Sequence, residues 1–373
     1  MAAIGALLTQ QPPVSSVDMG AAEYQVGGSS SAGTSLPARL AASTGTEYYV
    51  NYATGNDTTG TGAIGAPWKS IAQAMATVPN HSIVNLRGGN YPERVDPLAA
   101  WSGTAGGVKT LRSYPSETAV LQRYIRCDEG QPFQYWRFYG LDFYGTLTQV
   151  GEDTSFYGRA NTANLEFYNC NIHHQPLGSG MVFDTGSSNI QWHGCLVYQN
   201  GRASTILDHG LYISGVGHVI ANCVIYKNSA YGIQMYRAAD GCYVVNNTII
   251  ENGIRTSDPV WSGGMVLEAI AQDGTNNNLI MNNIMGWNDG AGIRTGGSLV
   301  GLNNQLRNNC CSQNVLADIY DNNAAFIKSG NISSDPILVD RAAENYRIQA
   351  TSPCRDAGLV AYAPSSDILG VAR

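Results

Sequence analysis

The sequence predicts an all-β solenoid in which short strands coil and stack on one another. A Gly-apolar-x-apolar motif recurs between about residues 161 and 312, a second short motif follows each copy, and apolar residues alternate within each copy. A unit of about 20 to 30 residues with such short strands cannot bury its own apolar face. Successive units must therefore stack, which predicts a parallel β-helix.

The first motif alternates apolar and polar residues with period two, which is typical of strands with one buried face. Its copies are GMVF at Gly180, GLYI at Gly210, GIQM at Gly232, GMVL at Gly264 and a shortened GIRT at Gly292. The spacing between these glycines is 30, 22, 32 and 28 residues. A coil tolerates such variation because insertions become loops.

The second motif appears as HGCLVYQN from His193, ANCVIYKN from Ala221, NNTIIEN from Asn246 and NNIMGWN from Asn282. Two repeating motifs predict two strands per coil. Asparagine tolerates the left-handed backbone of a tight corner, and its amide can bond to the copies above and below. Two Asn-rich columns are therefore predicted: Asn169, Gly194, Asn222, Asn247, Asn283, and Asn200, Asn228, Asn252, Asn288.

Cysteines follow the first of these columns at one inward position. Cys170, Cys195 and Cys223 occupy it, and in this alignment Thr248 and Ile284 continue it. We interpret them as small hydrophobic residues rather than metal ligands or disulfides. The eight cysteines contain no CxxC spacing, which argues against zinc.

Composition is consistent with one large core and excludes several function classes. The 373 residues are 43% hydrophobic and 13% charged, with a net charge of -7 and only four lysines. We expect no nucleic-acid partner and no membrane partner, because basic patches and long apolar runs are both missing from the sequence. The opening MAAIGALLTQQPP has no basic residue before its apolar run. We therefore expect no cleaved secretory signal.

The chain divides into four segments. Residues 1–46 form a Gly, Ser and Ala-rich extended arm, which we expect either the solenoid flank or a neighbouring chain to hold. Residues 47–100 form an N-terminal cap with a strand at 48–51, a helix starting at Pro67 or Trp68 and ending near Thr77, and a strand at 83–86. A short amphipathic helix suits the open end of a solenoid. Residues 101–330 are the coils, with loops expected at 308–327, and residues 331–373 are a closing coil and tail.

Both ends of the chain resemble a known group. The order YYV, GND, APWKSIAQAM, a strand, then RGGNY with Glu93, and later GNISSDPILVD and NYRIQATSPCRDAG, looks like right-handed parallel β-helix proteins of the pectate-lyase-like superfamily. Cys354 replaces an alanine that this group commonly has in its closing motif. The resemblance implies a single-stranded right-handed parallel β-helix. It implies little about activity, because the group includes lyases, hydrolases, epimerases, tailspikes and proteins without catalysis.

Outward side chains on the Gly-motif strands can be read from parity. One column is Val182, Tyr212, Gln234, Val266, Arg294, and the next is Asp184, Ser214, Tyr236, Glu268, Gly296. Aromatic rings stack on sugars, and charged groups bond hydroxyls or uronate carboxylates. Five residues are therefore candidates for binding a sugar chain: Asp184, Tyr236, Arg237, Glu268 and Arg294. A surface ion pair between Glu268 and Arg294, or a subunit interface at the tyrosines, would explain the same pattern.

Asp208, His209 and Tyr212 form the most enzyme-like local set. A carboxylate can orient a histidine, and a histidine beside a tyrosine can move protons next to a uronate carboxylate. The triplet is the candidate catalytic set, and the alternative is that Asp208 only shapes a turn. If the chain is an enzyme, we expect a polysaccharide lyase, an epimerase or a glycoside hydrolase.

The resemblance also implies a calcium clamp and a lysine or arginine base for lyases of this fold. Lys227 occupies the position of Gln199, Glu251 and Trp287 in other copies, which indicates turn variation. No three carboxylates fall on adjacent coils. His173 and His174 could bind a metal, but adjacent residues on a strand point apart. We predict no cofactor and no metal site, with calcium left open.

Two functional hypotheses follow. The first is a virion-associated protein of tailspike or tail-fibre type, a homo-oligomer and by preference a trimer, whose arm of residues 1–46 contacts neighbouring chains and whose solenoid binds, and in a catalytic form degrades, a surface polysaccharide. The second is a free carbohydrate-active lyase or epimerase. The predicted location is the virion or the extracellular space.

Overall fold

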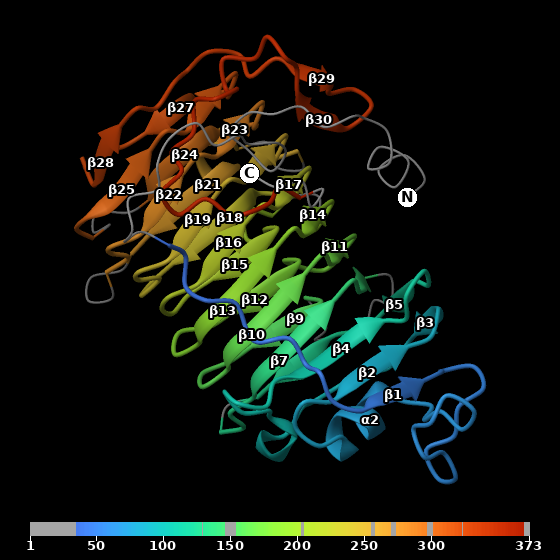
Figure 1. Cartoon of the computed structure of the whole chain (residues 1–373). Helices are drawn as coiled ribbons and strands as arrows, with labels where there is room; N and C mark the ends of the chain where they lie inside the picture. The colour runs from blue at the N-terminus through green and yellow to red at the C-terminus, as the bar shows by residue number, and fades with distance from the viewer. Residues whose placement is uncertain are drawn as a thin grey trace.

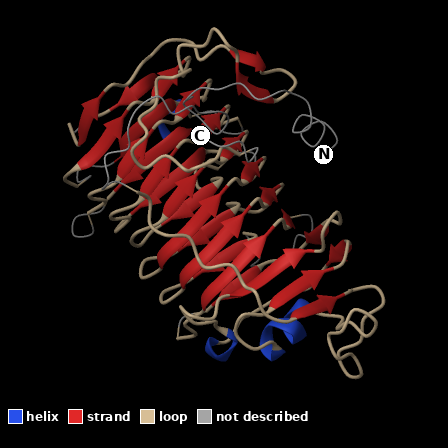
Figure 2. Cartoon of the chain, in the orientation of Figure 1, coloured by secondary structure: helices blue, strands red, loops and turns tan. Residues whose placement is uncertain are grey.

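The computed structural model describes residues 35–128, 130–145, 154–202, 205–254, 258–269, 274–296, 301–322 and 324–368. Within these ranges the chain is a right-handed parallel β-helix built almost entirely from strands (Figures 1 and 2). The predicted fold class is confirmed. Each coil contributes strands to three sheets rather than two, because a further strand precedes the second motif and is separated from the strand within that motif by a corner.

The first sheet contains eleven strands: β1 (Glu47–Val50), β2 (Ile83–Leu86), β4 (Lys109–Ser113), β7 (Gln134–Tyr139), β10 (Ala163–Tyr168), β13 (Ser188–His193), β16 (Val219–Ala221), β19 (Tyr243–Val245), β22 (Leu279–Met281), β25 (Asn304–Arg307) and β28 (Phe326–Ser329). The second contains nine: β3 (Gly89–Tyr91), β5 (Ala119–Leu121), β8 (Asp142–Tyr144), β11 (Asn171–His173), β14 (Leu196–Tyr198), β17 (Val224–Tyr226), β20 (Thr248–Ile250), β23 (Ile284–Gly286) and β26 (Cys310–Ser312).

The third sheet is formed by the Gly-motif strands. Its eight members are β6 (Ile125–Cys127), β9 (Phe156–Gly158), β12 (Met181–Phe183), β15 (Leu211–Ile213), β18 (Tyr231–Tyr236), β21 (Gly263–Glu268), β24 (Ala291–Gly296) and β27 (Ala317–Tyr320). The loops expected at 308–327 are wrong, because β26, β27 and the start of β28 lie there. The weak periodicity of this coil hid its strands.

The corner between the first and second sheets corrects the predicted asparagine alignment. Ala221 pairs with Val245, and Val245 with Met281, so Asn222 stands beside Asn246 and Asn282. All three residues have positive φ. Asn247 and Asn283 therefore continue the inward cysteine column, one residue away from the predicted alignment, and Asn247 Oδ1 accepts a hydrogen bond from the Cys223 N–H at 2.8 Å.

The second predicted asparagine column is confirmed, and it extends by one residue. Asn200, Asn228, Asn252, Asn288 and Asn314 are linked from coil to coil by amide hydrogen bonds of 2.9 to 3.1 Å. The first four are fully buried. Each amide also satisfies backbone groups at the corner, so the ladder fixes the distance between the second and third sheets.

The core is one continuous apolar column inside the coils. Aromatic side chains fill its N-terminal half, and aliphatic and methionine side chains fill the remainder. Phe167 stacks on Phe138 at 5.0 Å and on Trp192 at 5.8 Å between ring centroids. All eight cysteines are buried and free. The interpretation of the cysteine column as small hydrophobic residues is consistent with this packing.

The open N-terminal end is covered by the helix α2 (Ile71–Thr77), with the short 3-10 turn η1 (Ala99–Trp101) nearby. The helix starts later than predicted because Ser70 caps it, accepting from the Gln73 N–H at 3.1 Å. Glu93 accepts from the Ile71 N–H at 2.8 Å. Burial raises the pKa of Glu93 to about 6.

The described part of the arm, residues 35–46, lies across the first sheet as a strap (Figure 1). Gln191 donates to the Ala38 carbonyl at 3.0 Å, and Gly45 donates to the His81 carbonyl at 3.0 Å. Between these points Glu166, which is fully buried, pairs with both Arg39 and Arg137. The strap therefore satisfies a buried carboxylate. The predicted contact of residues 1–46 with a neighbouring chain stays a prediction, and residues 1–34 lie outside the described residues.

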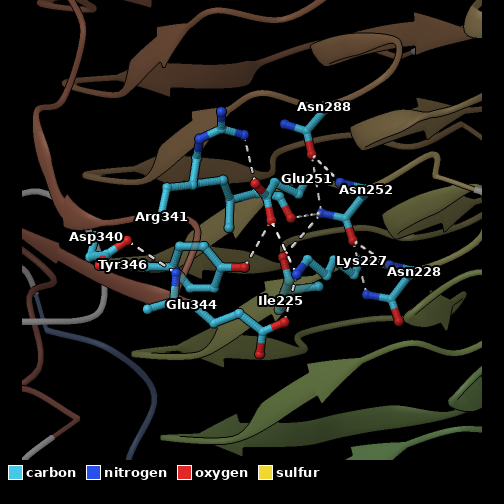
Figure 3. A network of polar contacts seen from close by, with 12 residues as sticks. Ile225, Lys227, Asn228, Glu251, Asn252, Asn288, Asp340, Arg341, Glu344 and Tyr346 are labelled. Atoms are coloured by element: carbon cyan, nitrogen blue, oxygen red, sulfur yellow. Dashed lines mark hydrogen bonds and ion pairs between the residues drawn. The ribbon is translucent and has the colours of Figure 1, made fainter. Parts of the chain in front are cut away.

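The C-terminal segment forms an antiparallel hairpin, β29 (Leu338–Asp340) and β30 (Asn345–Ile348), which closes on the second sheet. Glu251 accepts from Arg341 at 2.7 Å and from the Tyr346 hydroxyl at 2.9 Å. Lys227 pairs with Glu344 (Figure 3). We call these five residues the clasp. Lys227 is thus a turn residue with a structural partner, as its repeat position indicated.

Candidate functional site

The outward face of the third sheet carries the predicted strip of polar and aromatic side chains. The strand register confirms both predicted columns: Val182 pairs with Tyr212, Tyr212 with Gln234, Gln234 with Val266, Val266 with Arg294, and Tyr236 with Glu268. Tyr157 and Tyr320 extend the first column at its two ends. The structure therefore brings Tyr212, Tyr236, Glu268 and Arg294 onto neighbouring strands. We call these residues and Gln234 the third-sheet site.

Glu268 is half-buried at the end of β21. Its carboxylate accepts a hydrogen bond of 2.6 Å from Gln234 Nε2. Burial raises the pKa of Glu268, and the Gln234 hydrogen bond and the Arg294 charge oppose this shift without cancelling it. A carboxyl with a raised pKa in such a position can exchange protons with a bound ligand.

Arg294 is the most unusual side chain of the site. It lies on the outward face of β24, yet only 5% of it is exposed. Its Cζ lies 5.2 Å from the ring centroid of Trp261 and 5.3 Å from that of Tyr320. Its Nε and Nη1 are buried and have no hydrogen-bond partner among the described residues. A buried guanidinium with unsatisfied donors is costly, so this arrangement favours an anionic ligand.

The tyrosines of the site are partly buried neighbours. The rings of Tyr212 and Tyr236 lie 5.9 Å apart in a tilted arrangement. Burial raises the pKa of Tyr212, with Tyr236 and Asp184 adding to the shift. Arg237 follows Tyr236 at the turn that leaves the sheet, and its N–H donates to the Glu268 carbonyl at 3.2 Å. Both side chains can contact a ligand through the ring face and the hydroxyl.

Asp184 lies apart from Glu268. It is in the same column but three strands away, about 14 Å by strand spacing. Its Oδ2 accepts from the Tyr157 hydroxyl at 2.8 Å. The distance places Asp184 and Tyr157 at one end of the strip, and Glu268 and Arg294 near the other.

The predicted catalytic triplet does not form a relay of hydrogen bonds. Asp208 is buried and binds Arg202 through both carboxylate oxygens, at 2.7 and 2.8 Å. The His209 Nδ1 accepts from the Tyr231 N–H at 3.2 Å. Burial lowers the pKa of His209 to about 3, so its ring is neutral. The buried His209 ring stacks on that of Tyr212, with the ring centroids 6.0 Å apart.

Two residues of the site escaped the sequence analysis. Trp261 ends the 3-10 turn η2 (Pro259–Trp261), in a loop between the second and third sheets, where no repeat pattern applies. Tyr320 lies in the last coil, which lacks a Gly motif. Extending the outward column by one coil would have found Tyr320. No sequence pattern marks Trp261, which stands out only as a tryptophan.

A calcium clamp does not fit the third-sheet face. Calcium takes six to eight oxygen ligands, and the two columns offer the carboxylates of Asp184 and Glu268 three strands apart. Across the described ranges, no group of three or more His, Cys, Asp or Glu side chains is placed to hold a metal ion. In the same part of the chain, no helix is long and apolar enough to span a membrane.

Comparison with known proteins agrees with this architecture. Residues 48–334 match a family model described as Pel9A-like, right handed beta helix region. The chain belongs to this Pel9A-like family. The resemblance inferred from the two ends of the sequence is thereby confirmed, and the match covers the cap and all the coils.

Solved structures share the Pel9A-like fold at low identity. Pectate lyase Pel9A is 17% identical, with a TM-score of 0.61 over 89% of this chain and 97% of that one. A rhamnogalacturonan lyase is 14% identical, with a TM-score of 0.54 over 85% and 96%. The GH136 lacto-N-biosidase from Eubacterium ramulus is 12% identical, with a TM-score of 0.51 over 77% and 68%. No curated protein matches the sequence. The fold is thus related to polysaccharide lyases and glycoside hydrolases.

Proposed function

We propose that the third-sheet site binds an acidic polysaccharide through Arg294 and cleaves it by elimination through Glu268. The carrying observation is the buried Arg294 guanidinium, whose Nε and Nη1 lack partners among the described residues. A uronate carboxylate is the anion of a sugar chain, and it can accept two parallel hydrogen bonds from a guanidinium. Two structurally similar proteins are named as lyases of pectate and rhamnogalacturonan, which supports this substrate class.

Access to Arg294 requires a movement of Trp261. The indole covers the guanidinium, and 40% of Trp261 is exposed on its loop. Displacement of the indole opens the site, and the freed ring can then stack on a sugar face. The tyrosine rings of Tyr212 and Tyr236 continue the contact surface toward β15.

The chemistry follows from the neighbouring charges. With its carboxylate paired to Arg294, a uronate loses its C5 proton more easily. Glu268 accepts that proton, the C5 electron pair forms a C4–C5 double bond, and the C4–O bond breaks. The departing oxygen takes a proton from the Tyr236 hydroxyl or from water. The raised pKa of Glu268 makes it a stronger base than an ordinary carboxylate.

Hydrolysis has less support from the geometry. A hydrolytic pair of carboxyl groups lies about 5 to 9.5 Å apart. On the outward columns of the third sheet, the nearest partner of Glu268 is Asp184, about 14 Å away. Elimination needs one base and one charge-neutralising group, and Glu268 and Arg294 supply both.

The test is incubation with uronate polysaccharides while the ultraviolet absorbance of the unsaturated product is followed. We expect Glu268→Gln to lower kcat by about 10²- to 10⁴-fold with binding retained. Arg294→Ala should lower kcat/KM by about 10²-fold or more and weaken binding. Arg126→Ala is the matched control, because Arg126 lies in the same column six strands away.

The outcomes separate the two halves of the proposal. Unchanged binding in Arg294→Ala would remove the site altogether. Binding that depends on Arg294, without product from any uronate polymer, would leave a binding protein and remove the role of Glu268. A large rate loss in His209→Ala, with the fold intact, would return the acid–base role to the Asp208, His209 and Tyr212 triplet.

The virion-associated role and the trimer are further proposals, for which the Gly, Ser and Ala-rich arm is the support. The described part of the arm binds its own solenoid, so we rank this role behind the polysaccharide enzyme. Light scattering coupled to size exclusion tests the oligomer. A single species at the monomer mass of 39.8 kDa would contradict the trimer.

A further inference from the structure

His173 and His174 form an unusual pair on the second sheet, away from the third-sheet columns. Their adjacency on a strand argues against a shared metal site, because adjacent strand residues point apart. His174, however, has φ of 54°, in the left-handed region, as do Gln199, Lys227, Glu251 and Trp287 at the same corner. This backbone brings the two rings together, and their Nδ1 atoms share a hydrogen bond of 2.6 Å, whose proton a bound metal ion would replace.

Asp142 fixes the state of the inner imidazole. Its Oδ1 lies 2.6 Å from His173 Nε2, so Nε2 carries the ring proton and donates a hydrogen bond to the carboxylate. In the neutral ring the lone pair is then on Nδ1, which faces His174. A carboxylate behind a histidine is the arrangement that orients histidine ligands of metal ions.

The surroundings hold the His173 ring rigidly, and the buried Asp142 carboxylate beside it favours a nearby positive charge. His173 is stacked between Tyr144 at 4.8 Å and Tyr198 at 4.6 Å, and is almost fully buried. Asp142 is 1% exposed, and its Oδ2 has no hydrogen-bond partner among the described residues. A buried carboxylate with one unsatisfied oxygen is stabilised by a cation nearby.

We propose that the Nδ1 atoms of His173 and His174 are two ligands of a copper(II) or nickel(II) site at this corner. Access is direct, because His174 is exposed. Water or an oxygen of a bound sugar completes the coordination.

The geometry selects the metal. With metal–nitrogen bonds of about 2.0 Å, a right angle at the metal needs Nδ1 atoms about 2.8 Å apart, and a tetrahedral angle needs about 3.3 Å. The observed 2.6 Å is closer to the first value, and a small rotation of the exposed His174 ring provides the difference. Tetragonal copper(II) and nickel(II) therefore fit better than tetrahedral zinc, and copper binds more tightly by the usual order of divalent metals.

The experiment titrates the tag-free full chain with copper(II) chloride, by calorimetry and by electron paramagnetic resonance. We expect one site with two coupled imidazole nitrogens. His174→Asn tolerates the left-handed backbone and should raise Kd at least about tenfold and remove one nitrogen coupling. Asp142→Asn should raise Kd about 10- to 100-fold. His81→Asn is the control, since His81 is exposed and also has positive φ, and should change nothing.

Two results would overturn the proposal. One is an unchanged copper Kd in His174→Asn, which would assign binding to another group. The other is a spectrum without imidazole coupling in the unaltered chain. Tighter binding of zinc than of copper would contradict the choice of metal, and His174→Asn would then show whether the same pair holds it.

Discussion

Replacement of Asn252 by Asp tests the buried asparagine ladder. The two side chains have the same shape, so the change removes the Nδ2 donor and leaves the Oδ1 acceptor. Asn252 Nδ2 donates to the Ile225 carbonyl at 3.0 Å and to Asn288 Oδ1 at 3.1 Å. Asn288 Oδ1 keeps the Asn252 backbone N–H at 3.0 Å. Loss of the donor to the buried Ile225 carbonyl costs about 1 to 3 kcal/mol and loss of the second hydrogen bond about 0.5 to 1.5 kcal/mol, so the free energy of unfolding should fall by about 1.5 to 4.5 kcal/mol.

The assay is urea denaturation followed by circular dichroism, with Asn303→Asp as the matched control. Asn303 is exposed and donates once, to Asn277 Oδ1 at 3.2 Å, so its replacement should change the unfolding free energy by less than about 0.5 kcal/mol. The loss in Asn252→Asp should also shrink at low pH, because the protonated acid regains a donor. Equal effects at the two positions would refute the reasoning that the buried amide contacts stabilise the corner.

Three further predictions concern carboxylates and their partners. Because the folded chain raises the pKa of Glu93 from 4.5 to about 6, the stability that it contributes is present below pH 4.5 and falls by about 2 kcal/mol as the pH rises through 6. Urea denaturation should lose this pH dependence in Glu93→Gln, and an unchanged profile would contradict it. Glu251→Gln should weaken the clasp by about 1 to 2 kcal/mol, seen as faster proteolysis within the hairpin; an equal cleavage rate would speak against the clasp. Arg294→Ala should move the acidic side of the kcat–pH profile toward higher pH, because the Arg294 charge lowers the pKa of Glu268. If the residual kcat keeps the same pH dependence, Arg294 does not act on Glu268.

The fold could be predicted because the same sequence motif recurs in successive coils of the solenoid. The Gly motif marks one strand in each coil, and its period of two identifies the inward and outward faces without any tertiary information. The ladder of Asn200, Asn228, Asn252 and Asn288 was visible for the same reason. Each structural position recurs in several coils, so it could be recognised from several copies of the motif.

The asparagine register shows where repetition misleads. Asn246 and Asn247 are adjacent, and either can be aligned with Asn222. The structure chooses by backbone conformation: Asn246 takes the left-handed corner, and Asn247 turns inward to replace a cysteine. Identity of residue type cannot separate these roles, because asparagine suits both.

The candidate site was predictable only where it follows the repeat. The outward columns gave Glu268 and Arg294 with the correct neighbours. The burial of Arg294 against Trp261 was not predictable, because Trp261 lies in a loop outside the repeat. Asp208 and His209 looked like a relay in sequence, but Arg202 binds the carboxylate and the imidazole is buried.

The described strap ties the cap end of the first sheet to its later coils. Leu36 packs near Val219, Val245 and Leu279, on the seventh to ninth of the eleven strands of the first sheet and far from the cap. These contacts all lie over the first sheet, so the described strap leaves the outward face of the third sheet and the corner of His173 and His174 uncovered.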